Sequence, residues 1–112
     1  MLRVIVHDGA DVGADDMRAF LAARMQLAPH RVAVIIDQRN IRSMTREAQE
    51  AGTDGADKRP TLAVAILIGS PIAVIIANFF IIFGRPHYPT KLFTTEQAAL
   101  SWFEELRRAE QP

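Results

Sequence analysis

Apolar residues change their spacing several times along this chain, and each spacing predicts one type of element. Short runs rich in β-branched residues predict strands at residues 2–7, 31–37, 61–68 and 88–93. Apolar residues at helical spacing, or capping patterns, predict helices at residues 15–27, 43–50, 72–83 and from residue 94 onward. The order βαβαβαβα predicts one α/β domain over residues 1–112, with a mainly parallel sheet of four or five strands covered by helices.

One long segment without charge has to be explained. No charged residue lies between Arg59 and Arg85, and that length would cross a bilayer as a single helix. Gly69-Ser70-Pro71 interrupts it, because Ser can cap a helix and Pro is favoured at the first helical position. We therefore expect a buried strand, a turn and a helix that rises only about 18 Å. Insertion into or association with a membrane is the alternative.

The helix at residues 72–83 is apolar on every side. Asn78 is its only polar side chain, whereas a helix that covers a sheet usually shows water a charged face. An uncovered apolar strip of ~300 Å² costs about 7 kcal/mol at roughly 25 cal/mol per Å². We expect the outward face to meet a second copy, an apolar ligand or lipid, unless Trp102, Phe103 and the chain ends cover it. The predicted contact residues are Val74, Asn78, Phe80 and Ile81.

Composition removes several classes of function. Apolar residues make up 49% of the chain, which is too many for a disordered protein. Thirteen basic residues balance thirteen acidic ones, so we expect no nucleic acid partner. The chain has no cysteine, which excludes disulfides, a thiol nucleophile and cysteine-based metal sites. A cytoplasmic location fits these features.

Candidate ligand residues follow the predicted strands, because ligands bind beyond the carboxyl ends of parallel strands. Asp37, Gly69 and Ser70 lie there and would hold any ligand. Gly69 and Ser70 could bind an anion at a helix N-terminus, although Pro71 removes one amide donor. Ser70 as a nucleophile lacks an identifiable histidine base.

A magnesium site made by Asp8 and Asp37, as in receiver domains, is a further alternative. The fourth strand ends in Phe93-Thr94-Thr95, without the lysine that such a site would want. We expect both carboxylates to accept turn amides instead. The sequence therefore predicts no catalytic residue, no metal and no cofactor.

Taken together, several segments resemble the STAS-like superfamily, and within it the small bacterial SpoIIAA-like (STAS/SEC14-like) proteins. The segments are residues 31–37 before a short helix, residues 62–68, Ser70-Pro71 before Asn78-Phe79-Phe80, and residues 88–93 followed by 96–103. The resemblance implies a non-enzymatic interaction module with a four- or five-stranded sheet. It also implies a kinase-regulated turn with a phosphorylatable serine.

This chain departs from the family at two places. The regulated turn would fall on Met44-Thr45-Arg46-Glu47, where an arginine stands in place of the serine, so we expect no such switch. Ser43 and Thr45 are nearby hydroxyls that we expect to cap a helix. Family members begin with a β-hairpin, but only one strand is predicted here, so the hairpin is shortened or a sheet edge is open.

These observations lead to one preferred function and one alternative. We expect a self-associating regulatory or partner-binding protein, a homodimer or larger oligomer. The alternative is a binder or carrier of a hydrophobic small molecule or lipid, which the apolar helix and the SEC14-like resemblance support.

Overall fold

The computed structural model describes residues 1–53, 59–84 and 88–110, without the side chains of Thr53, Ile76, residues 79–84 and Glu110. Six strands and four helices lie in these ranges. The strands are β1 (Leu2–Ile5), β2 (Asp11–Val12), β3 (Val32–Asp37), β4 (Ser43–Met44), β5 (Thr61–Leu67) and β6 (Thr90–Phe93). The helices are α1 (Ala14–Leu27), α2 (Arg46–Thr53), α3 (Pro71–Gly84) and α4 (Glu96–Glu110).

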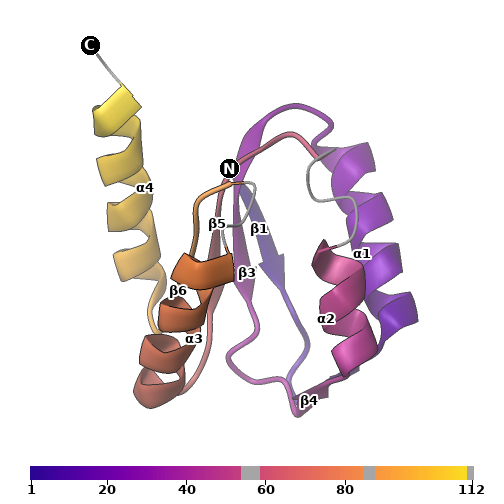
Figure 1. Cartoon of the computed structure of the whole chain (residues 1–112). Coiled ribbons are helices and arrows are strands. Elements are labelled where there is room, and N and C mark those ends of the chain that lie inside the picture. The colour runs from indigo at the N-terminus through magenta and orange to yellow at the C-terminus, as the bar shows by residue number, and fades with distance from the viewer. Residues whose placement is uncertain (54–58, 85–87, 111–112) are drawn as a thin grey trace.

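Four strands form the main sheet in the order β1-β3-β5-β6, and every neighbouring pair is parallel (Figure 1). The predicted α/β class and strand–helix alternation are therefore confirmed. The unbroken apolar runs of β3 and β5 place these strands at the centre, because a central parallel strand is buried on both faces. The outer strands β1 and β6 have four residues each.

The segment before the second helix differs from the prediction. Ser43 and Met44 form β4, which pairs in parallel with β2, so the helix begins at Arg46 rather than at residue 43. The Ser43 hydroxyl donates to the Asp11 carboxylate across this small sheet, at 2.6 Å. Thr45 caps the helix as expected, since its hydroxyl accepts the Ala48 N–H at 3.0 Å.

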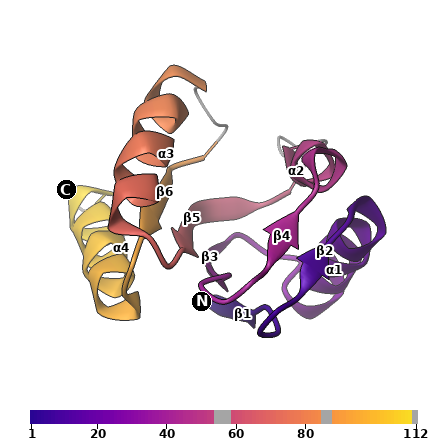
Figure 2. The same cartoon turned by 90° about the horizontal axis from the view of Figure 1, so that it is seen from below.

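Helices cover the two faces of the sheet unequally (Figure 2). α4 packs alone on one face, where Ile35, Ala65 and Leu67 are buried beneath Ala99, Trp102 and Phe103. α1 and α2 lie on the opposite face, where Val32, Val34 and Val64 form a second core cluster. α3 lies against the outer strand β6, so it covers an edge of the sheet rather than the middle of a face.

In the part of the chain that the structure describes, no helix is both long enough and apolar enough to span a bilayer. Gly69 and Ser70 separate β5 from α3, so the uncharged segment is divided as the sequence predicts.

Candidate functional site

The first turns of α3 present apolar side chains to solvent. The helix begins where the Ser70 hydroxyl accepts the Ala73 N–H at 3.2 Å, so Ser70 is its capping residue. Ile72 and Ile75 are each 71% exposed, whereas Val74 is half-buried. The two isoleucines lie one helical turn apart and together form a small apolar patch, the kind of surface that marks interaction sites when it is extended by its neighbours.

Asn78 has a contact that the sequence does not reveal. Its side-chain amide donates to the Leu92 carbonyl at 3.0 Å, and its side-chain oxygen accepts the Leu92 N–H at 2.8 Å. The carbonyls of Pro89, just before β6, and of Phe93 accept the N–H groups of Val64 and Ile68. Because backbone groups alternate along a strand, those of Leu92 point away from the sheet. Asn78 therefore occupies the place that a further strand would take beside β6.

The four predicted contact residues thus have different roles in the structure. Val74 lies beside the two exposed isoleucines, and the Asn78 amide is used inside the fold. The side chains of Phe80 and Ile81 lie outside the described part of the chain. Ile72 and Ile75, which the sequence reasoning did not select, are the exposed large apolar residues among the described side chains of this helix.

At the carboxyl end of the sheet, the Asp37 carboxylate is already bound. It accepts the Arg39 backbone N–H at 3.1 Å and two guanidinium donors of Arg39, at 3.0 and 2.8 Å. The Arg39 side chain lowers the pKa of Asp37, and burial opposes this only in part. The expected role of Asp37 as an acceptor of a turn amide is therefore confirmed.

The structure brings Asp37 and Gly69 together through Arg39. A Cβ atom at Gly69 would lie 3.1 Å from the Arg39 carbonyl oxygen, so glycine allows the two turns to approach closely. Ser70 is next in the chain, but its hydroxyl caps α3. Within residues 1–53, 59–84 and 88–110, no three His, Cys, Asp or Glu side chains form a cluster that could hold a metal.

A groove of about 440 Å³ lies between α4 and the amino ends of the strands. Ala33 and Ala63, which are paired in register on adjacent strands, line it. Their small side chains leave space that longer residues would fill. The residues lining it are Met1, Ala33, Leu62, Ala63, Pro89, Leu100, Phe103, Glu104, Leu106 and Arg107.

Arg24 is a buried charge that the sequence reasoning missed. It is 3% exposed and donates to the carbonyl of Ala28 and, at 2.5 Å, to that of Pro60. Burial lowers the pKa of Arg24, and nearby Arg59 lowers it further. Its contacts join the end of α1 to the start of β5, which is a role in the fold.

Comparison with known proteins supports this architecture. Residues 1–107 match the model of a family described as a domain of unknown function, DUF7793. The chain belongs to this family. No curated protein matches the DUF7793 chain significantly.

A solved structure shares the fold of this DUF7793 chain. It is an uncharacterized protein of the DUF3478 family from Shewanella loihica PV-4, described as having a SpoIIAA-like fold. The two chains are 17% identical, the TM-score is 0.57, and the match covers 89% of this chain and 79% of the other. The resemblance to SpoIIAA-like proteins inferred from the sequence is therefore confirmed at the level of the fold.

Proposed function

We propose that this DUF7793 chain is a non-catalytic interaction module that associates with a second copy of itself through the start of α3. The observation that carries the proposal is the exposure of Ile72 and Ile75 on a helix that has no charged side chain over its whole length, residues 71–84. Burying two such side chains contributes about 1.5–3 kcal/mol each, and a two-fold contact counts each of them twice.

The chemistry at the carboxyl end of the sheet supports a role without catalysis. The Asp37 carboxylate is bound by the Arg39 guanidinium, and the Ser70 hydroxyl caps α3. Both groups are thus engaged in contacts within the fold. Binding of a partner needs none of these groups.

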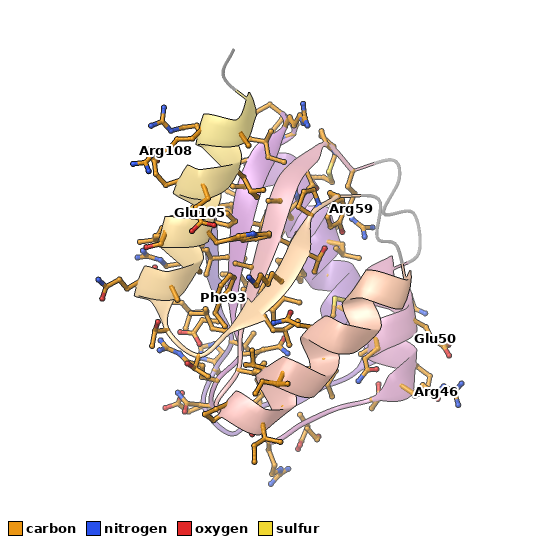
Figure 3. The ribbon with its side chains drawn as sticks, turned by 60° about the vertical axis from the view of Figure 1, so that its left-hand side comes forward. Arg46, Glu50, Arg59, Phe93, Glu105 and Arg108 are labelled. Atoms are coloured by element: carbon orange, nitrogen blue, oxygen red, sulfur yellow. The ribbon has the colours of Figure 1, made fainter. Side chains whose placement is uncertain are left out.

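The regulatory turn of the SpoIIAA-like family also supports this reading. Arg46 stands where the phosphorylatable serine would be, and its side chain pairs with Glu50 on the next turn of α2, at 3.4 Å (Figure 3). The side chain at position 46 therefore has no hydroxyl to which a kinase could transfer a phosphate group. Association in this chain is therefore controlled by concentration or by a partner rather than by a kinase at this turn.

Light scattering at micromolar concentration tests the proposal. Ile75→Glu should at least halve the mass, because it places a charge in the buried centre of the contact. Leu27→Glu is the matched control, since Leu27 is 75% exposed at the end of α1 and lies outside the contact. A monomeric wild type, or equal masses for the wild type and Ile75→Glu, would contradict the proposal.

The groove beneath α4 favours a second candidate, binding of an apolar small molecule. Its volume falls in the range of small-molecule sites, and most of its lining is apolar. Native mass spectrometry of the purified protein should then show a bound apolar compound. Ala33→Leu should remove it by filling the groove, and a bare mass for the wild type would count against this candidate.

A further inference from the structure

We draw no further inference here: the strongest candidate, the groove between α4 and the amino ends of the strands, belongs to the second candidate function already described, and because its two charged lining residues, Glu104 and Arg107, pair with each other, nothing in the structure shows which class of apolar ligand would occupy it.

Discussion

The two edges of the sheet end in different ways. At β6, the Asn78 side chain on α3 satisfies both outward groups of Leu92, so a further strand cannot pair at this residue. At β1, backbone groups alternate so that those of Arg3 and Ile5 point away from β3, and the described residues give them no backbone partner. Two edge strands of the same length and orientation can thus differ in whether their outward backbone groups are free for a partner. Here the difference is the side-chain amide of Asn78.

The same amide explains why α3 can be apolar throughout. Among the described side chains of α3, Ile72 and Ile75 are exposed, and Asn78, the only polar residue of the helix, is turned toward β6. The exposed face therefore carries no charge to keep a second copy away. The position of α3 along β6 therefore has two results: Asn78 binds the edge of the strand, and Ile72 and Ile75 face solvent.

Proline scanning of β1 should give the largest effect. Val4→Pro removes an N–H that points to β3 and should lower the free energy of unfolding by about 3 kcal/mol or more. Ile5→Pro removes only an outward N–H and should lower it by less than about 1 kcal/mol. Urea unfolding in dilute protein measures both values, and comparable losses for the two variants would show that the inward and outward residues of β1 are assigned wrongly.

Removal of the amide at β6 should have the next largest effect. Asn78→Leu keeps the size of the side chain but leaves the N–H and C=O of Leu92 without partners, which should cost about 2–3 kcal/mol. The variant should also aggregate more readily, because a second open edge appears. A loss below about 0.5 kcal/mol would mean that Asn78 does not close this edge.

Asn78→Asp adds a pH dependence to this test. The ionised carboxylate still accepts the Leu92 N–H but faces the Leu92 carbonyl with a second oxygen, so the neutral acid is favoured and its pKa rises in the folded state. The variant should therefore recover stability relative to the wild type as the pH falls through that raised value. Asn78→Leu should show no such recovery.

The sequence predicts the sheet well and its edges poorly, and the reason is physical. Apolar runs such as residues 61–68 and the capping residues Ser70 and Thr45 act over a few positions, so spacing alone identifies them. Asn78 was singled out as the only polar residue of its helix, but its partner Leu92 lies 14 residues further along. No local pattern links these two positions.

Arg24 shows the same limit for a charged residue. It lies among exposed residues of α1 in the sequence and is indistinguishable there from a solvated arginine. Its burial depends on the Pro60 carbonyl, 36 residues away. The groove beneath α4 likewise depends on the register that sets Ala33 beside Ala63, which strand prediction does not provide.

The smallest of these effects concerns the inner side of β1. The Asp37 carbonyl receives the last backbone hydrogen bond of that strand, and its carboxylate is held by Arg39. Because Arg39 lowers the pKa of Asp37, its pairing stabilises the fold above the ordinary carboxyl value near pH 4 and is lost as the pH falls through the lowered value. Asp37→Asn should cost about 1 kcal/mol at pH 7, since the pair is partly exposed. In urea titrations the difference from the wild type should shrink below pH 4, and a difference that stays constant down to pH 2 would mean that Arg39 does not bind the ionised carboxylate.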